Sequence, residues 1–269
     1  MQWGFHHGLL ADGLTDGVDC GAGFNVRRVG FEHRPIRGEG LFRLPLLPEG
    51  VADLQAQGFD EIVIATGVLP RTPGIPGIDH PKVLSYVDVL RGKAQVGEKV
   101  AVIGAGGIGF DVSEFLAEHP REGEQPLPEW MKEWGVDMNS DAPGGLVEPD
   151  VEKPARQITL LQRKPTSLGK DLGKTSGWVH RATLKSRNVE MLKGCSYEKI
   201  DDAGLHIKIG EESRVLDVDH VVICAGQESL RELYQEDAKN FHLIGGADLA
   251  AELDAKRAIR QGAEVAAAL

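Results

Sequence analysis

Six residues near the middle of the chain have the types and spacing that bind the phosphates of a dinucleotide. Residues 104–109 read Gly-Ala-Gly-Gly-Ile-Gly and match the GxGxxG pattern. Gly104 permits a tight turn, Gly106 lets the backbone approach a pyrophosphate, and Gly109 lets a following helix pack close to the preceding strand. The first amides of that helix, beginning near Gly107, then face the anion. A structural turn without a ligand is the alternative interpretation.

The segments on either side of these glycines favour the nucleotide interpretation. Residues 100–103 form an apolar, β-branched run of the kind buried on both faces of a parallel sheet. A glycine pattern between such a strand and an amphipathic helix is far more specific than the pattern alone. Apolar side chains at helical spacing predict the inner face of that helix: Ile108, Val112, Phe115 and Leu116.

The overall composition excludes several classes of partner. A net charge of −11 over 269 residues argues against a nucleic-acid or anionic-membrane binder, because such partners need a basic face. The three cysteines, Cys20, Cys195 and Cys224, are far apart and fit neither a disulfide framework nor a CxxC metal or cluster site. No signal peptide is recognisable and no apolar run approaches membrane-spanning length. We therefore expect a cytoplasmic protein without a metal site.

Two further apolar strands end in a small residue and a glycine, at residues 61–65 and 220–224. The last strand of a doubly wound sheet ends in this way, so that the loop passes close to a bound dinucleotide. Two such strands predict two nucleotide-binding domains, although two unrelated buried strands are the alternative. The candidate cofactor contacts at these strand ends are Ala65, Thr66, Gly67, Ala225 and Gly226.

A basic pair predicts which nicotinamide nucleotide binds. Prolines and glycines mark an insertion at about 117–155, after which the next strand is expected at 157–161. An NAD site usually places Asp or Glu at the end of this strand, but here Arg163 and Lys164 follow it. Each could hold a 2′-phosphate through a charge-assisted contact worth about 1.5 to 3 kcal/mol. This predicts NADP(H) over NAD(H); a solvated basic pair is the alternative.

The segment after this strand is expected to form a helix and then a β-meander. Residues 169–175 read GKDLGKT, one residue short of a P-loop, and we interpret them as the start of the helix that carries Trp178, Val179, Ala182 and Leu184. Lys170 and Lys174 add positive potential near the phosphate. The short strands of the meander are expected at 190–192, 197–200, 205–209 and 214–218.

The C-terminal part suggests a second cofactor contact. An apolar run at 241–244 ends in a glycine pair followed by Asp248, and residues 252–268 read as an alanine-rich helix. An acid beside a glycine turn at a helix start can accept hydrogen bonds from a ribityl hydroxyl, and the helix N-terminus stabilises negative charge on a reduced flavin. The alternative is that Asp248 only caps a helix. Residues 1–50, by contrast, show no clear period and read as irregular.

Taken together, the chain from about residue 59 to 262 resembles the C-terminal part of NADPH-dependent 2,4-dienoyl-CoA reductases, iron-sulfur flavoenzymes related to old yellow enzyme and trimethylamine dehydrogenase. The matching stretches are FDEIVIATGVLPRTP, IDHPKVLSYVDVL, GAGGIGFDVSEFL, EWGVD, LLQRK, DLGKTSGWVHRATL, VVICAGQE and LIGGADLAAELDAKRAI.

The resemblance implies an α/β fold with Rossmann-like doubly wound parallel sheets, in two interleaved dinucleotide-binding domains. Residues 80–226 would bind NADP(H), and residues 1–79 with 227–269 would form a partial FAD-binding domain. By position, Arg163 and Lys164 carry over as contacts of the NADP phosphate. The FAD contacts that carry over are Asp248, Ala255, Lys256 and Arg257.

In this family, hydride passes from NADPH to FAD, and electrons then pass through a [4Fe-4S] cluster to FMN in a TIM barrel. The barrel reduces unsaturated fatty acyl-CoA in fatty acid β-oxidation. The barrel, its acid-base residues, the FMN site, the cluster cysteines and the first glycine fingerprint of the FAD domain have no counterpart here. We therefore predict no catalytic residue in this chain, an incomplete FAD site, and a barrel or iron-sulfur subunit as a possible companion. A diaphorase-like NAD(P)H:flavin oxidoreductase and a truncated, non-catalytic nucleotide-binding remnant are the alternatives.

Overall fold

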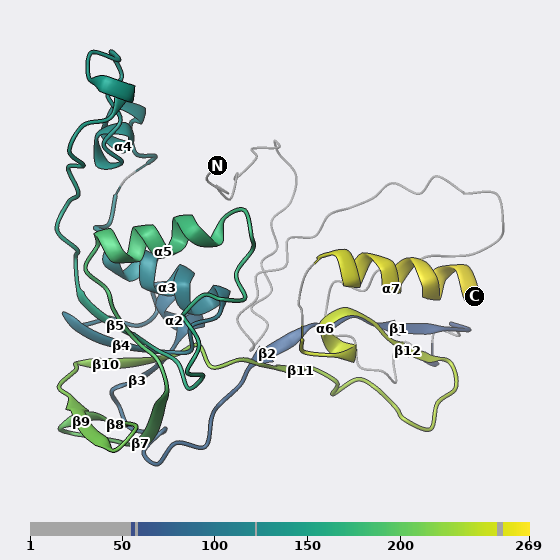
Figure 1. The fold of residues 1–269 in the computed structure, drawn as a ribbon. Coiled ribbons are helices and arrows are strands. Elements are labelled where there is room, and N and C mark those ends of the chain that lie inside the picture. Colours follow the sequence, from purple (N-terminus) through teal and green to yellow (C-terminus); the bar gives the residue numbers. More distant parts are fainter. Residues whose placement is uncertain (1–54, 57–58, 122, 252–254) are drawn as a thin grey trace. The chain divides into compact units, whose positions relative to one another are not determined.

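The computed structural model describes residues 55–56, 59–121, 123–251 and 255–269 (Figure 1). Contacts divide the chain into two compact units, of which the larger comprises Ala65–Arg231 and Ile244–Ala267. The irregular segment expected at 1–50 lies outside the described residues. The division by cofactor at 79/80 and 226/227 stays a prediction.

A five-stranded parallel sheet forms the centre of the larger unit. The strands order as β3-β10-β4-β5-β6, and every neighbouring pair runs parallel. The sheet confirms the predicted α/β fold with a parallel, Rossmann-like sheet. Its strands are β3 (Val83–Ser85), β4 (Lys99–Ile103), β5 (Gln157–Leu161), β6 (Glu190–Leu192) and β10 (His220–Ile223).

Both faces of this sheet are covered, as the apolar runs predict. Helices α2 (Tyr86–Leu90), α3 (Gly107–Ala117) and α5 (Gly177–Ser186) lie over one face, and a β-meander lies over the other (Figure 1). Along β4 the side chains alternate: Val100 and Val102 pack in the helix-side core, whereas Ala101 and Ile103 pack in the meander-side core. Period-two alternation with apolar residues on both faces is what a fully buried strand requires.

The meander itself consists of β7 (Cys195–Asp201), β8 (Gly204–Ile209) and β9 (Glu212–Leu216), paired antiparallel in that order. The prediction that residues 190–192 belong to it was wrong. These residues form β6, which extends the parallel sheet by pairing with β5. Helix α5 is the crossover that returns the chain to that sheet edge, as parallel neighbours require.

Two expectations about the helices also need correction. Phe115 is 50 % exposed, because the face of α3 that packs inward carries Phe110, Val112 and Leu116 instead. Trp178 lies in α5, the helix on which it was predicted, and is 59 % exposed. Helix α5 begins at Gly177, so residues 169–175 precede this helix and do not start it.

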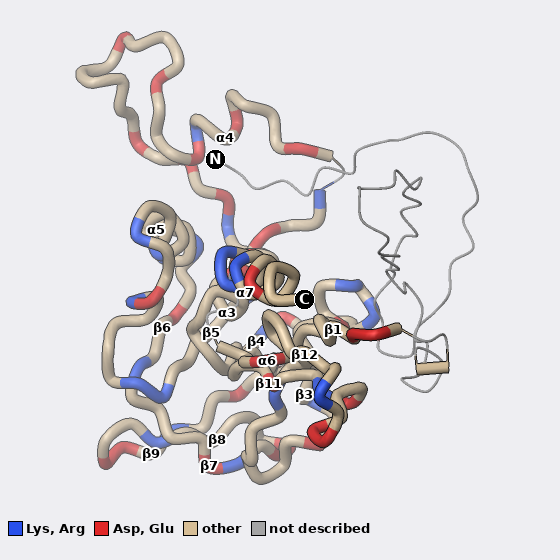
Figure 2. The backbone as a smooth tube through the Cα atoms, turned by 90° about the vertical axis from the view of Figure 1, so that its right-hand side faces the viewer, with Lys and Arg blue, Asp and Glu red and all other residues tan. Residues whose placement is uncertain are grey.

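The insertion between α3 and β5 carries the short helix α4 (Leu127–Glu133) and the 3-10 turn η1 (Pro143–Gly145). Residues 117–155 contain ten acidic and three basic residues, and Asp and Glu visibly predominate along this segment in Figure 2. Helix α4 buries none of its residues. The insertion therefore depends on polar contacts to hold it in place.

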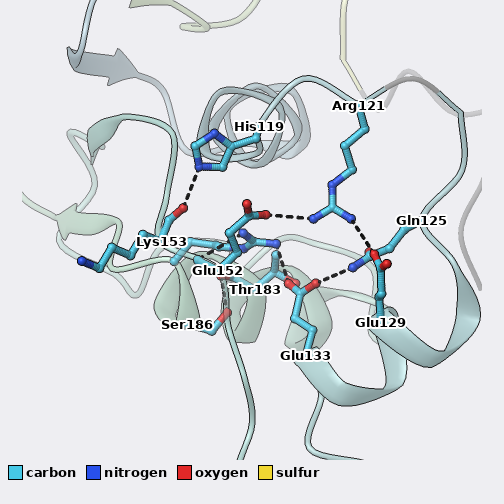
Figure 3. Close-up of polar contacts among 10 residues, drawn as sticks. His119, Arg121, Gln125, Glu129, Glu133, Glu152, Lys153, Thr183 and Ser186 are labelled. Atoms are coloured by element: carbon cyan, nitrogen blue, oxygen red, sulfur yellow. Dashed lines mark hydrogen bonds and ion pairs between the residues drawn. The ribbon is translucent and has the colours of Figure 1, made fainter.

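One buried arginine anchors this insertion to the end of α5. Arg187 is only 4 % exposed, its Nη2 donates to Glu133 Oε1 at 2.5 Å, and its Nη1 donates to the Glu152 carbonyl at 3.3 Å. Arg121 adds a 2.9 Å ion pair to Glu152, and His119 lies 3.0 Å from the Lys153 carbonyl (Figure 3). Removing the Glu133 carboxylate would leave the Arg187 charge buried and without its ion-pair partner.

The remaining strands are short. In the smaller unit, β1 (Ile62–Ile64) pairs parallel with β12 (Phe241–Leu243), at the positions where strands were expected. In the larger unit, β2 (Val68–Pro70) pairs antiparallel with β11 (Gln227–Ser229), and the C-terminal helices are α6 (Gly245–Asp248) and α7 (Ala255–Ala268). Within the described ranges, no helix has the length and apolar character that crossing a membrane would need.

Candidate functional site

The glycine turn after β4 has a conformation that only glycine adopts readily. Gly104 has φ +112°, and a Cβ there would lie 2.3 Å from the Cys224 carbonyl oxygen. A Cβ on Gly109 would lie 1.7 Å from the Gly104 carbonyl oxygen and 3.5 Å from Leu160 Cδ1. These contacts are the tight turn and the close helix-strand approach that the spacing of the glycines predicts.

Gly106 and Gly107 have a different environment, because a Cβ on either would meet nothing within 4 Å. Gly106 is the N-cap of α3, with no side-chain cap and no acidic residue in the first turn. The amides at this helix start are therefore not capped by a side chain and can face an anion. They open on a groove of about 790 Å³, a volume within the usual range for small-molecule sites.

The loop after β5 lines the same groove and carries positive charge. Arg163, Lys164 and Lys170 line it, and Lys164 Nζ lies 3.5 Å from Asp171 Oδ2. Both members of this ion pair are largely exposed, so the pair is weak. With Arg71, four cations and one carboxylate line a groove in a chain of net charge −11.

Arg71 was not predicted from the sequence as a site residue. It holds the turn that follows β10, at Ala225 and Gly226. Its Nε donates to the Ala225 carbonyl oxygen at 2.9 Å, and its Nη2 also donates to this oxygen. The Arg71 backbone N–H donates to the Gly226 carbonyl oxygen at 3.0 Å. Gly226 has φ +103°, and a Cβ there would lie 3.3 Å from Arg71 Nη2. No local motif signals this contact, because 154 residues separate Arg71 from Ala225.

Two titratable side chains in the groove wall stay neutral. Burial raises the pKa of the Cys224 thiol to about 12, and burial also raises the pKa of the Tyr197 hydroxyl above its ordinary value. Neither group is ionised at neutral pH, so neither acts there as a nucleophile or base. Among the described residues, no cluster of His, Cys, Asp and Glu has the geometry to hold a metal ion.

The predicted cofactor residues thus divide into two sets. The residues that line or directly support the groove are Gly104, Gly106, Gly107, Gly109, Arg163, Lys164, Ala225 and Gly226. The other predicted cofactor contacts, which include the four predicted FAD contacts, lie outside its lining: Ala65, Thr66, Gly67, Asp248, Ala255, Lys256 and Arg257.

Within the second set, two glycine segments approach each other closely. A Cβ on Gly246 would lie 2.8 Å from Val68 Cγ1 and 3.1 Å from the Gly67 carbonyl carbon. Gly67 has φ +83°, and a Cβ on it would meet nothing within 4 Å. The space in front of Gly67 is therefore open, as the approach of a ligand to this turn would require.

Asp248 follows the glycine pair within a short helix of its own. It is the last residue of the four-residue helix α6, and the long helix α7 begins, within the described residues, at Ala255. Its Oδ2 accepts a hydrogen bond from Gln261 Nε2 at 2.7 Å, while Gln261 Oε1 accepts from the Gly245 amide at 2.8 Å. Asp248 thus ties α6 to α7.

Comparison with known proteins decides the family. Residues 25–249 match the family model described as pyridine nucleotide-disulphide oxidoreductase, which is more than half of the chain. The chain belongs to this family. It is accordingly an oxidoreductase domain of the FAD- and NAD(P)-binding type.

The individual relatives share less than 30 % of their aligned residues with this chain and are much longer than it. The chain is 29 % identical to a metal reductase of Desulforamulus reducens, over 75 % of this chain and 29 % of the relative, and 27 % identical to a cinnamate reductase of Clostridium sporogenes, over 71 % and 24 %. A solved 2-naphthoyl-CoA reductase complex with 2-naphthoyl-CoA aligns with TM-score 0.58 at 22 % identity, over 80 % of this chain and 27 % of that one, and shows the shared fold. The chain therefore spans less than a third of the length of these relatives.

Proposed function

We propose that this chain is the NADPH- and FAD-binding, electron-input portion of an enzyme of the 2,4-dienoyl-CoA reductase type, which reduces unsaturated fatty acyl-CoA. One observation carries the proposal: residues 104–108 of the glycine turn and the basic pair Arg163-Lys164 line a single groove. A helix start with open amides suits a pyrophosphate, and two cations on the adjacent loop suit a 2′-phosphate.

The residues of the groove fit NADP(H) in shape as well as in charge. Side chains on Gly106 or Gly107 would fill the space that a pyrophosphate needs, and both positions are open. Arg71 fixes the strand end at Ala225, so the opposite wall is held in place before a ligand arrives. When bound, the two cofactors supply hydride transfer from the nicotinamide to flavin N5, and the protein supplies binding and orientation.

In this proposal, FAD binds near the point where Gly67 and Gly246 lie close together. The proposed FAD contacts are Ala65, Thr66, Gly67, Asp248, Ala255, Lys256 and Arg257. The open space in front of Gly67 supports this placement. Asp248 keeps one carboxylate oxygen beyond the one that accepts from Gln261, so it can still accept a ribityl hydroxyl.

The final electron acceptor lies beyond this chain in our proposal. The metal reductase and the cinnamate reductase are each more than three times as long as the segment that aligns with this chain, and the second is named for cinnamate, an unsaturated carboxylate. We propose that a companion barrel or iron-sulfur subunit, with FMN and a [4Fe-4S] cluster, receives the electrons and reduces the acyl-CoA double bond.

An absorption spectrum tests this proposal directly. The purified full chain is incubated with FAD, desalted, and then mixed anaerobically with NADPH. Retained flavin bands that bleach with NADPH are the expected result. Rapid NADPH-driven dye reduction without any companion would favour a diaphorase, and a colourless chain that still binds NADPH would favour a nucleotide-binding remnant.

A further inference from the structure

The side chain of Gln162, the first residue after β5, turns back onto its own loop. Its Nε2 amide donates to the carbonyl oxygens of Lys164 at 3.0 Å and Thr166 at 2.6 Å, and lies 3.3 Å from Thr166 Oγ1. Both carbonyl partners can only accept, so they require a donor at this position. One amide therefore bonds the backbone of the loop on both sides of residue 165.

The backbone of this loop is also held from the opposite side. The backbone N–H of Gln162 donates to the Leu192 carbonyl oxygen at 2.9 Å. The backbone carbonyl oxygen of Gln162 accepts from the Cys195 backbone N–H at 3.0 Å. The Lys164 carbonyl accepts a second hydrogen bond, from the Gly194 amide at 3.1 Å. The Lys164 carbonyl is thus fixed between the Gln162 side chain and the link from β6 to β7.

This arrangement matters because the two cations of the loop are themselves exposed. Arg163 and Lys164 are both exposed, and Asp171, the ion-pair partner of Lys164, is exposed as well. Long charged side chains lose rotamer freedom when they bind, so a loop that is ordered beforehand reduces the entropy lost on binding. Both side chains line the groove, so a fixed backbone keeps their points of attachment in place.

We infer that Gln162 is a positioning residue that orders the phosphate-binding loop and thereby makes the groove selective for NADP(H) over NAD(H). The inference rests on the proposed binding of NADP(H) in this groove. NAD sites commonly have a carboxylate near this strand end that accepts hydrogen bonds from the ribose hydroxyls. A carboxylate at position 162 could not donate to the Lys164 and Thr166 carbonyl oxygens, and these oxygens would repel it. It could then accept hydrogen bonds from the ribose hydroxyls of NAD(H) instead.

Two variants separate loop ordering from added charge. Gln162→Met keeps the length of the side chain but removes both amide donors, whereas Gln162→Glu keeps the shape and adds a negative charge. Gln157 provides matched controls, because it lies exposed at the opposite end of the same strand. Gln157→Met and Gln157→Glu repeat both chemical changes away from the loop.

The measurement is the Kd of NADPH and of NADH for the full chain, by fluorescence titration of each nucleotide, with thermal unfolding of every variant. For Gln162→Met we expect the Kd of NADPH to rise at least tenfold while the Kd of NADH changes less than threefold. For Gln162→Glu we expect NADPH to weaken further and NADH to strengthen, so that the preference reverses. Both Gln157 variants should keep the wild-type ratio.

The outcomes that would overturn the inference differ from those that would overturn the proposed function. If the wild-type chain prefers NADPH but the Gln162 variants weaken both nucleotides equally, or neither, the inference is wrong and the proposed function stands. If the wild-type chain binds neither nucleotide, both are wrong. Because Gln162→Glu is isosteric, it reports on selectivity even if Gln162→Met unfolds.

Discussion

The basic pair after β5 supports the sharpest prediction about cofactor choice. Replacing Arg163 and Lys164 together by glutamine should weaken NADPH binding by ten- to thirtyfold and leave NADH binding nearly unchanged. Only the 2′-phosphate distinguishes the two nucleotides, and these side chains lie on the loop that lines the groove after β5. A selective loss is therefore the signature of phosphate recognition.

The magnitude follows from the exposure of the two side chains. A charge-assisted contact to phosphate is worth about 1.5 to 3 kcal/mol when well formed, but exposure to solvent screens it. Lys164 must also leave Asp171, an exposed partner at 3.5 Å, at a cost of about 0 to 1 kcal/mol. The pair together should then contribute about 1.4 to 2 kcal/mol, which is the stated ten- to thirtyfold change in Kd.

The assay is titration of the purified chain with NADPH and with NADH, followed by nicotinamide fluorescence. Asp171→Asn is the companion variant, because removing this carboxylate frees Lys164, and we expect NADPH to bind up to about fivefold tighter. Equal losses of NADPH and NADH in the double variant would refute phosphate recognition by this pair. So would an unchanged affinity for both.

Three further predictions concern stability and the thiol. Gly109→Ala would place a Cβ 1.7 Å from the Gly104 carbonyl oxygen, so urea unfolding should show a loss of about 1 to 3 kcal/mol together with loss of NADPH binding; wild-type stability would contradict the tight helix-strand approach. Glu133→Ala leaves the buried Arg187 charge unpaired and should cost about 3 to 5 kcal/mol in the same assay, whereas the double variant Glu133→Leu with Arg187→Met should cost less; equal costs would show that the buried charge is not the cause. Burial raises the pKa of Cys224 from 9.0 to about 12, so the folded protein holds this proton more tightly than the unfolded chain does, and stability should fall as pH rises from about 9 to 12. Cys224→Ala should flatten that fall, and an unchanged slope would show that this thiol does not titrate with unfolding.

Local patterns were sufficient for the elements that form the groove. The buried strands β4 and β5 are short apolar runs, and both of their faces are covered. Such runs predict a strand without any knowledge of the neighbouring strands. The glycine spacing after β4 was equally readable, since Gly104 and Gly109 each have a steric reason that depends on residues a few positions away or on the adjacent strand. Chemistry that is encoded within about ten residues was therefore predictable.

Contacts between distant segments were not predictable in the same way. The residues at 190–192, Glu-Met-Leu, carry no sign of whether they pair with a parallel or an antiparallel neighbour, so β6 was assigned to the wrong sheet. Arg71 reaches Ala225 across 154 residues, and no motif marks the pairing. The role of Gln162 is local, but the sequence shows only that an acid is absent there; which atoms its amide contacts depends on how the loop folds.

The distribution of charge explains how an acidic chain can offer a site for a polyanion. Residues 117–155 alone hold a net charge of −7 out of −11, and Figure 2 shows the many acidic residues of this insertion. None of its described residues lines the groove. At physiological ionic strength, exposed charges are screened beyond about 8 Å. Affinity for the nucleotide then depends on the charges in direct contact, which are the cations of the groove and the open amides at the start of α3. Net charge correctly argues against extended polyanions such as nucleic acids, which need a broad basic face, and it carries no weight against one nucleotide bound in a groove that is locally basic.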